Sequence, residues 1–570
     1  MKNITKSATA ALSLFAAAGF AAPDDPGTAP PEAVAKWRDA RFGLFVHWGP
    51  VSLKGTEIGW SRGAQVPLEE YDNLYKKFNP TLFNADEWVA VAKAAGMKYL
   101  VLTTKHHDGF CLWDTRQTDH NIMRSPFGRD VTGELAAACK KAGLAFGTYY
   151  STCDWHHPAF PKGSPGGRTN KPNPDLKAYD AYLQAQVTEL LTRYGPLFTV
   201  WFDVPQSYDQ TYGIPMVRKI RALQPDLMIN NRAYSIGGRG SGIGTQLPVG
   251  DYDTPEQRIG GFQLDRPWET CMTICRQWAW KPNDNMKSLD ECLHTLLRVN
   301  GGDGNLLFNV GPMPDGRIEP RQVERLKEMG AWLARHGEAV YGTRGGPWKP
   351  SARLASTRKD NKVFLHILQR PTSGPVALPA PPQAVRSARV LNGPEVGLAT
   401  SGGLLRITIP DHAWDKVATV VELTLDGPAM KIAPLEQSLG AVIRGTKASA
   451  SAVFGNEPQY AADKAIDGDS ATRWATPAGT SACWLRLDFP AATLAGVEID
   501  EEFASPRSRV RRFELQVMDG GAWRTVHSGK ALGANFSAEF PPVTTTALRL
   551  NILDASEGPT LSALRVIPAP

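Results

Sequence analysis

The sequence predicts an α/β protein in which a (β/α)8-like barrel precedes two β-sandwiches, and three observations support this prediction. Between residues 31 and 346, strand-like runs alternate with helical runs, which is typical of a parallel sheet wrapped by helices. Five of the strand-like runs end in a polar residue of a catalytic type. Beyond residue 346, apolar and polar residues alternate in short runs, as they do in antiparallel sheets.

The elements of the barrel follow one another with short breaks at Gly96, Gly143, Gly195 and Pro225, which are helix-stop residues. A doubly wound open sheet is the alternative fold, but it lacks the support of a glycine-rich phosphate loop. The predicted strands cover residues 41–46, 97–104, 144–149, 197–202 and 227–231, and the predicted helices cover 86–95, 132–142, 179–194, 217–224 and 289–299.

Two all-β domains are predicted after the barrel. Alternating runs at 362–368, 388–391 and 404–409 indicate a small β-sandwich over residues 347–430. A linker at 434–445 separates it from a second all-β domain over residues 446–570, whose runs include 484–489, 513–517 and 547–552.

Composition agrees with a folded protein of several domains. The 570 residues are 42% hydrophobic and 21% charged, so extended disorder is not expected. The 63 Lys and Arg are scattered among 57 Asp and Glu without a basic block, which argues against nucleic acid as a partner. The chain has seven cysteines, which is an odd number, and their spacing does not suggest a disulfide framework. We therefore predict that they are buried free thiols.

Residues 1–22 have the pattern of a secretory signal peptide. Lys2 and Lys6 precede an apolar run over residues 8–20, and small residues close the segment at Ala21 and Ala22. No later apolar run has the length of a membrane span. We therefore expect export to the periplasm or the medium.

The polar strand ends predict one site, because the carboxyl ends of the strands of such a barrel meet at one face. Asp203 follows four bulky residues, and a carboxylate there is costly to bury unless it is paired or functional. A set of His and Asp side chains could bind zinc, but hydrogen bonds to substrate hydroxyls are the favoured interpretation. The candidate zinc ligands are His47, His106, His107 and Asp203, and Tyr150 and Arg232 are the other polar residues at strand ends.

Asp203 fits the nucleophile of a retaining glycosidase, which also needs a second carboxyl group as general acid. Two later residues are candidates for that acid, Glu256 in Thr-Pro-Glu-Gln and Glu269 in Pro-Trp-Glu-Thr. Spacing alone does not choose between them.

The motif FGLFVHWG at 42–49, followed by KHHDGF at 105–110, resembles the α-L-fucosidases of glycoside hydrolase family 29. WFD at 201–203 and NLLFNVGP at 305–312 match further signatures of that family in the same order. The resemblance covers residues 31–345. It implies a retaining exo-hydrolase, with no cofactor for catalysis, that releases terminal fucose from a fucosylated glycan.

The resemblance also implies individual roles. Asp203 matches the nucleophile, and Glu256, with Glu269 as the alternative, matches the acid/base. Val204 stands where glycine is common after the nucleophile. Substrate-binding roles are implied for His47, Glu57, Trp60, His106, His107, Tyr150, Arg232 and Trp278, of which Glu57 and Trp60 lie at the pocket edge and Trp278 near the sugar's methyl group.

The C-terminal segment resembles the discoidin or coagulation factor 5/8 type C domain through AIDGD at 465–469 and TRW at 472–474. This resemblance implies a sugar-binding-type domain and makes Asp467, Asp469 and Thr472 candidate ligands of a structural Ca²⁺.

We expect a secreted α-L-fucosidase. A related glycosidase acting on α-galactosides and a non-catalytic fucose-binding lectin are the rival functions, with a metal-dependent hydrolase as a third. The sequence leaves the linkage preference, the ligand of the last domain and the oligomeric state open.

Overall fold

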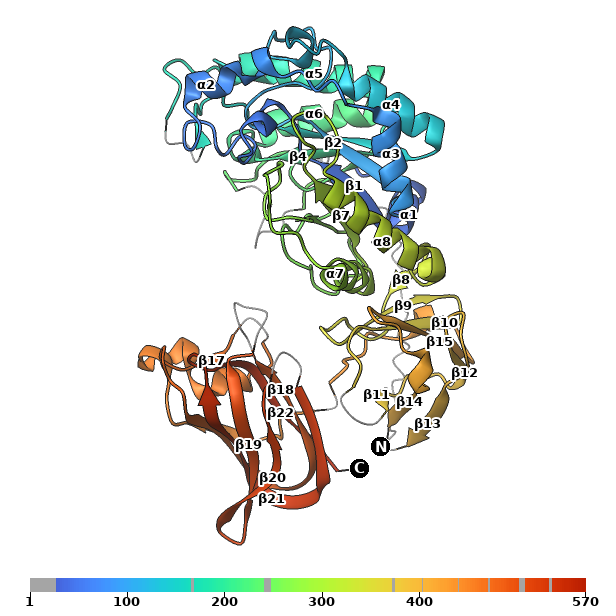
Figure 1. Cartoon of the computed structure of the whole chain (residues 1–570), viewed down its shortest axis with the longest axis vertical. Helices are drawn as coiled ribbons and strands as arrows, with labels where there is room; N and C mark the ends of the chain where they lie inside the picture. Colours follow the sequence, from blue (N-terminus) through green and yellow to red (C-terminus); the bar gives the residue numbers. More distant parts are fainter. Residues whose placement is uncertain are drawn as a thin grey trace, which may run out of the picture.

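The computed structural model describes residues 27–165, 169–239, 248–371, 375–401, 403–438, 440–469, 472–501, 508–532 and 536–569, so the predicted leader lies outside the described residues. The predicted alternation of strands and helices is confirmed (Figure 1). The barrel strands are β1 (Phe42–Val46), β2 (Tyr99–Lys105), β3 (Ala145–Ser151), β4 (Thr199–Asp203), β5 (Met228–Ile229), β6 (Glu269–Thr273) and β7 (Asn305–Val310).

These seven strands form one parallel sheet in the order β5-β4-β3-β2-β1-β7-β6. Residues 252–256 lie between its two edges. Asn230 bridges Tyr252 on the β5 side, and Glu256 bridges Cys271 on the β6 side, both in parallel orientation. This irregular segment completes the ring, so the barrel-like architecture is confirmed.

Five of the helices, α3 to α7, start at side-chain caps that the sequence supplies. Asp130 accepts a hydrogen bond from the Gly133 amide at the start of α4, as N-cap residues do. One predicted boundary is wrong, because α6 begins at Gln210, where Asp209 provides the cap, and not at residue 217. The helices are α1 (Pro31–Ala40), α2 (Leu68–Asn73), α3 (Ala85–Ala94), α4 (Val131–Ala142), α5 (Leu176–Arg193), α6 (Gln210–Leu223), α7 (Leu289–Gly301) and α8 (Pro320–His336).

Large aromatic side chains fill the barrel interior. Phe45, Tyr99, Tyr149 and Trp201 come from neighbouring strands, and each is at most 1% exposed. Residues of a strand point alternately to its two faces, so each strand sends one set inward and packs the other against helices. The inward set forms the floor on which the strand-end residues lie.

Asp303, in the turn between α7 and β7, joins the amino-terminal end of the barrel to the next domain. Its carboxylate is fully buried and pairs with Arg38 at 3.0 Å, with Arg41 at 2.9 Å and with Arg344. It also accepts a hydrogen bond from the Gly345 amide at 2.9 Å. One carboxylate therefore holds together α1, the start of β1 and the first strand of the following sandwich.

The small β-sandwich has one sheet in the order β12-β15-β10-β9-β8 and another in the order β11-β14-β13. Its core is separate from that of the barrel. The strands are β8 (Arg344–Gly345), β9 (Leu354–Lys359), β10 (Lys362–Ile367), β11 (Val376–Pro379), β12 (Val385–Val390), β13 (Gly397–Ser401), β14 (Leu404–Thr408) and β15 (Thr419–Leu425).

The C-terminal domain is antiparallel and is drawn as a separate body in Figure 1. Its strands are β16 (Lys447–Ala450), β17 (Trp474–Ala475), β18 (Cys483–Glu501), β19 (Val510–Asp519), β20 (Ala522–Gly529), β21 (Phe536–Ala555) and β22 (Thr560–Pro568).

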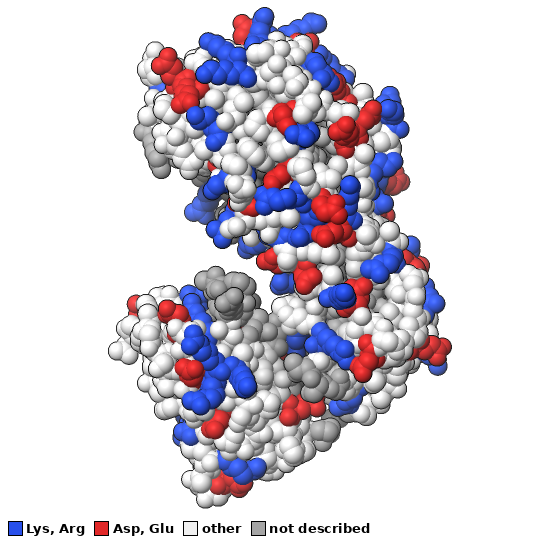
Figure 2. Space-filling view, in the orientation of Figure 1, with Lys and Arg blue, Asp and Glu red and all other residues white. Residues whose placement is uncertain are grey.

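The distribution of charged side chains and the state of the cysteines agree with the predictions from the sequence. Figure 2 shows basic and acidic side chains interspersed over the visible face of the barrel. All seven cysteines lie within the described segments, and each is buried and free. Among the helices of these segments, none combines the length and the apolar character that crossing a membrane requires.

Candidate active site

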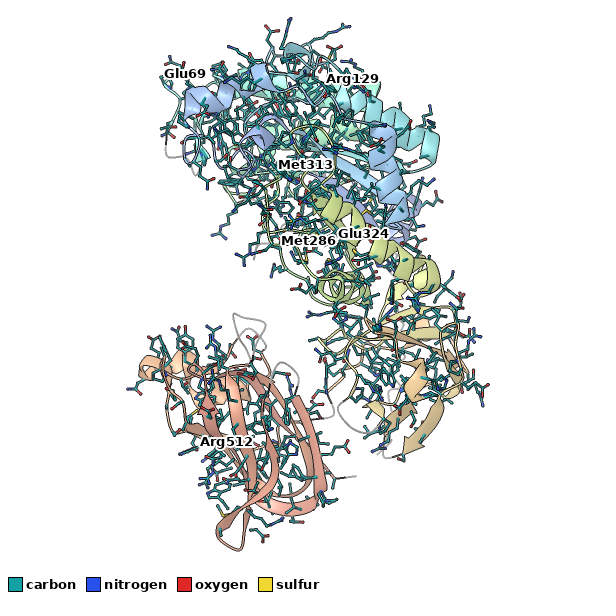
Figure 3. All side chains as sticks on the ribbon, in the orientation of Figure 1. Glu69, Arg129, Met286, Met313, Glu324 and Arg512 are labelled. Carbon is teal, nitrogen blue, oxygen red and sulfur yellow. The ribbon has the colours of Figure 1, made fainter. Side chains whose placement is uncertain are left out.

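The strand ends meet at one face of the barrel, and Asp203 lies at its centre. Met313, which Figure 3 labels, lies just beyond the carboxyl end of β7. Asp203 ends β4, and its Oδ1 lies 2.8 Å from Nη1 of Arg232. The same Nη1 lies 3.0 Å from Oε2 of Glu256. The Asp203 side chain is 15% exposed and that of Glu256 27%, so both carboxylates can be reached from solvent.

The position of Arg232 is set by the segment that closes the barrel. Its Nε donates to the Thr254 hydroxyl at 2.9 Å, and its Nη2 donates to the Thr254 carbonyl at the same distance. The guanidinium also covers the ring of Trp201 at 4.7 Å from the centroid. These contacts orient the guanidinium so that Nη1 meets both carboxylates.

Asp203 stays ionised despite its burial. Burial alone would raise its pKa, but the charge of Arg232 and hydrogen bonds from Arg232 and Tyr149 outweigh that effect. The pKa of Asp203 is therefore held below its ordinary value. A carboxylate that remains charged at mildly acidic pH is ready to act as a nucleophile.

Three neutral histidines lie beside this carboxylate. His47 Nδ1 lies 2.6 Å from Oδ1 of Asn309, and His107 Nδ1 lies 2.8 Å from the Ser151 hydroxyl. Burial lowers the pKa of His47 to about 3 and that of His107 to about 4, and it lowers the pKa of His106 well below its ordinary value. Neutral imidazoles can donate and accept hydrogen bonds with sugar hydroxyls.

The histidines and Asp203 are not grouped as the ligands of a metal ion in the described residues. In the part of the chain that the structure describes, no group of three or more His, Cys, Asp or Glu is placed to hold a metal ion. His107 Nε2 lies 3.8 Å from Oδ2 of Asp203, beyond the distance of a direct hydrogen bond. The arrangement fits recognition of a polar substrate better than ligation of zinc.

Glu57, Trp60 and Trp278 lie together at the edge of the site but have different roles in the structure. Glu57 accepts hydrogen bonds from the amides of Trp278 and Ala279, at 2.9 and 3.0 Å, and therefore holds that loop. The Trp278 ring lies 4.8 Å from that of His47. Trp60 is 45% exposed, and its ring lies edge-on to His107 at 5.5 Å.

Tyr150 requires a correction, because the structure turns it away from the site. Its hydroxyl donates to Oε1 of Gln186 on α5 at 2.8 Å, and the residue is fully buried. Tyr149 instead donates to Oδ2 of Asp203 at 2.9 Å. Adjacent residues of a strand point to opposite faces, so only one of the two tyrosines can reach the interior. The predicted strand ends at residue 149, but β3 continues to Ser151, so Tyr150 lies within the strand and points outward.

We expect Tyr149→Phe to reduce kcat/KM by about tenfold to 100-fold, because it removes a hydrogen bond to a charged group. The pKa of Asp203 should rise, so the acidic limb of the pH profile should move to higher pH. Tyr150→Phe is the matched control and should leave kcat/KM nearly unchanged. Equal losses in the two variants, measured across a pH series, would contradict this assignment.

The two candidate acids occupy different layers of the barrel. Glu256 lies at the strand ends beside Asp203. Glu269 begins β6 at the opposite end, where it pairs with Asn305 at the start of β7. Glu269 is fully buried, accepts a hydrogen bond from Trp201 Nε1 at 3.1 Å and pairs with the Tyr99 hydroxyl. It lies in a strand beneath the floor and not in a loop, so the geometry favours Glu256.

The candidate calcium ligands lie in one turn of the C-terminal domain. The Thr472 hydroxyl lies 2.7 Å from the Asp467 carboxylate and 3.1 Å from the Asp469 carbonyl oxygen. Lys464 Nζ lies 3.4 Å from the same carboxylate. Carboxylate, hydroxyl and carbonyl oxygens are the donors that Ca²⁺ prefers, so this donor set fits the ion.

A parallel barrel whose strand ends carry two carboxylates on one arginine has the architecture of a glycoside hydrolase. The family model described as Alpha-L-fucosidase matches residues 18–338, more than half of the chain. The chain therefore belongs to the α-L-fucosidase family, glycoside hydrolase family 29. The F5/8 type C domain model matches residues 446–565.

Relatives and solved structures agree with this assignment. The alpha-L-fucosidase of Branchiostoma floridae is 31% identical over 407 residues, which cover 66% of this chain and 88% of that relative. Plasma alpha-L-fucosidase of Homo sapiens is 30% identical over 381 residues, covering 60% and 78%.

Among solved structures, alpha-L-fucosidase isoenzyme 1 from Paenibacillus thiaminolyticus has a TM-score of 0.63 and 34% identity, covering 69% of this chain and 99% of that one. A Bacteroides thetaiotaomicron GH29 alpha-L-fucosidase, trapped as a covalent intermediate with 2-fluoro-fucosyl fluoride, has a TM-score of 0.64 and 26% identity, covering 70% and 98%.

Proposed function

We propose that this enzyme hydrolyses terminal α-L-fucosidic bonds with retention, through a covalent fucosyl-aspartate intermediate on Asp203. The contact of Arg232 Nη1 with both carboxylates is the observation that carries the proposal. It brings an oxygen of Asp203 to within about 6 Å of one of Glu256, close to the roughly 5–5.5 Å of retaining glycosidases and below the range of inverting ones.

In the first step, Asp203 attacks C1 of fucose while the bond from C1 to the leaving oxygen breaks. Glu256 gives its proton to that oxygen, so the product alcohol leaves neutral. In the second step, water attacks C1, its proton passes to Glu256, and the bond from C1 to Asp203 breaks. Both carboxyl groups return to their starting states, and the released fucose keeps the configuration of the substrate.

The surrounding side chains are proposed to hold the sugar. His47, His106 and His107 would bind hydroxyl groups as neutral imidazoles, and Arg232 would add charge-assisted donors. Bonds that strengthen as the oxocarbenium-like transition state forms would lower the barrier. The Trp278 ring would pack against the methyl group of fucose, which offers an apolar surface.

The test is hydrolysis of p-nitrophenyl α-L-fucoside beside p-nitrophenyl α-galactoside and a branched fucosyl-trisaccharide. We expect release of fucose, with the α-anomer appearing first by NMR. Release of galactose alone would favour the α-galactoside activity, and binding of fucose without turnover would favour a lectin. A first product of the β-configuration would overturn retention.

We expect Glu256→Gln to reduce kcat/KM on a fucosyl-oligosaccharide by about 10²–10⁴-fold, the usual contribution of general acid catalysis. Formation of the covalent intermediate from fucosyl fluoride should be much less affected, because fluoride leaves without protonation. Stopped-flow measurements with both substrates provide the comparison. Glu269→Gln is the control, and a leaving-group-dependent loss there would instead make Glu269 the acid.

Export and calcium binding are two further proposals, and each rests on one short segment of the chain. The basic start and apolar run of residues 1–22 support export, which the mass of the secreted protein would test. Ca²⁺ would be held by oxygens of Asp467, Asp469 and Thr472. Adding millimolar Ca²⁺ after EDTA treatment should raise the Tm of the C-terminal domain, and Asp467→Asn should abolish that rise.

A further inference from the structure

Glu269 is a buried acid for which the proposed mechanism has no use. It lies in the centre of the barrel, fully buried, one layer beneath the strand-end residues. Its Oε1 accepts from Trp201 Nε1 at 3.1 Å, and its Oε2 pairs with the Tyr99 hydroxyl. Burying a carboxyl group that has no ion-pair partner costs free energy of folding, so the presence of Glu269 here requires a reason.

Trp201 connects this acid to the site. Its ring stacks on Tyr149, with centroids 5.6 Å apart and planes at 18°, and supports the Arg232 guanidinium at 4.7 Å. Tyr149 and Arg232 are the two residues that donate side-chain hydrogen bonds to Asp203 within the described residues, at 2.9 and 2.8 Å. The indole therefore contacts both groups that orient the nucleophile.

The hydrogen bond that the indole donates to Glu269 fixes its in-plane rotation. Stacking alone allows a ring to slide or turn within its plane, because the contact is spread over the whole surface. A directional bond at Nε1 restrains this freedom. Rotation of the indole would shift the surface on which both Tyr149 and Arg232 rest.

We infer that Glu269 is a positioning residue, which acts through Trp201 to hold Tyr149 and Arg232 against Asp203. This inference rests on the proposed function of Asp203 as the nucleophile. Displacement of reacting groups by about 1 Å can cost about 100-fold in rate, so a distant support can affect turnover strongly.

The surroundings favour the neutral form. Burial raises the pKa of Glu269 to about 8. The titratable groups acting on it are Tyr99 on β2, Tyr252 on the closing segment and Cys271 on β6, and burial raises the pKa of each. All of them are uncharged at neutral pH. A protonated carboxyl keeps one oxygen to accept from Trp201 and is matched in shape by glutamine.

The test compares Glu269→Gln and Glu269→Leu in the full chain. Active-site titration with 2-fluoro-fucosyl fluoride counts the sites that can form the covalent intermediate. Partial unfolding would lower the number of titrated sites, whereas mispositioning would lower the rate at each titrated site. On p-nitrophenyl α-L-fucoside we expect kcat per titrated site to fall about tenfold to 100-fold in Glu269→Leu, with KM within about threefold. Glu269→Gln should keep at least about a third of the wild-type rate.

Tyr252→Phe is the matched control. It removes a buried hydrogen bond from the same layer, the one to Thr199 at 2.8 Å, and should lower the Tm without changing kcat per titrated site. If Glu269→Leu does not fold, Trp201→Phe removes the same donor and should show the same loss of rate.

Two kinetic results would overturn the inference: wild-type kcat per titrated site in Glu269→Leu, or equal losses in Glu269→Gln and Glu269→Leu. A wild type that neither turns over the fucoside nor reacts with the fluoride would count against the proposed function. The crystal structure of Glu269→Leu decides the inference separately. An unmoved Trp201, Tyr149 and Arg232 would refute it, and a rotated indole would support it.

Discussion

Asp203→Ala is expected to abolish fucoside hydrolysis, with kcat falling roughly 10³-fold or more, as losses of covalent nucleophiles do. The reason is direct, since the variant lacks the atom that captures C1. Arg232 keeps Glu256 as a partner, so the fold should survive. Steady-state rates on p-nitrophenyl α-L-fucoside measure the loss.

Azide sharpens this test. A small anion can occupy the space that the carboxylate leaves, so azide should restore release of p-nitrophenol and give β-fucosyl azide. Asp209→Asn, which alters the cap of α6 six residues away, is the matched control and should retain activity. Rescue that yields the α-azide, or full activity without azide, would contradict the assignment of Asp203 as nucleophile.

Asp303→Asn is expected to cost about 3–5 kcal/mol of stability, the usual cost of breaking a buried ion pair. The reason is that Arg38, Arg41 and Arg344 would lose the carboxylate that holds them together. The unfolding transition of the barrel should move down by roughly 5–15 °C in calorimetry. Activity at low temperature should persist, because Asp303 lies at the amino-terminal end of the barrel.

The control for this prediction is Asp119→Asn. Asp119 pairs with Arg124, and their side chains are 83% and 62% exposed, so its loss should change stability by no more than about 0.5 kcal/mol. If the two variants lowered the unfolding temperature by similar amounts, the buried ion pairs of Asp303 would contribute no more to stability than an exposed pair.

Much of the fold could be predicted from the sequence, because its signals are local. Alternation between periods of 2 and 3.6 marks strands and helices, and glycines mark where helices stop. The start of α6 was missed because its cap, Asp209, lies among polar residues that read as a loop. β6 was missed because its role depends on pairing with β7, a partner distant in sequence.

The site could be predicted only in part. The chain order of His47, His107, Asp203 and Arg232 at strand ends was sufficient to place them together, because parallel strands share one carboxyl face. The sequence does not show which of Tyr149 and Tyr150 faces the barrel interior, because that depends on how β3 is oriented in the sheet. A shift of one residue exchanges the inner and outer faces.

The barrel, the two β-domains, the family and the candidacy of Asp203 as nucleophile follow from the amino-acid sequence, because each rests on a local pattern or motif. The preference for Glu256 over Glu269 needs the folded structure. Both are acids in the stretch that follows Arg232, and their difference arises from closure of the ring, which brings residues 252–256 to the face of Asp203 and buries the start of β6 beneath it. Closure depends on contacts between segments far apart in the chain, and periodicity along one segment does not record them.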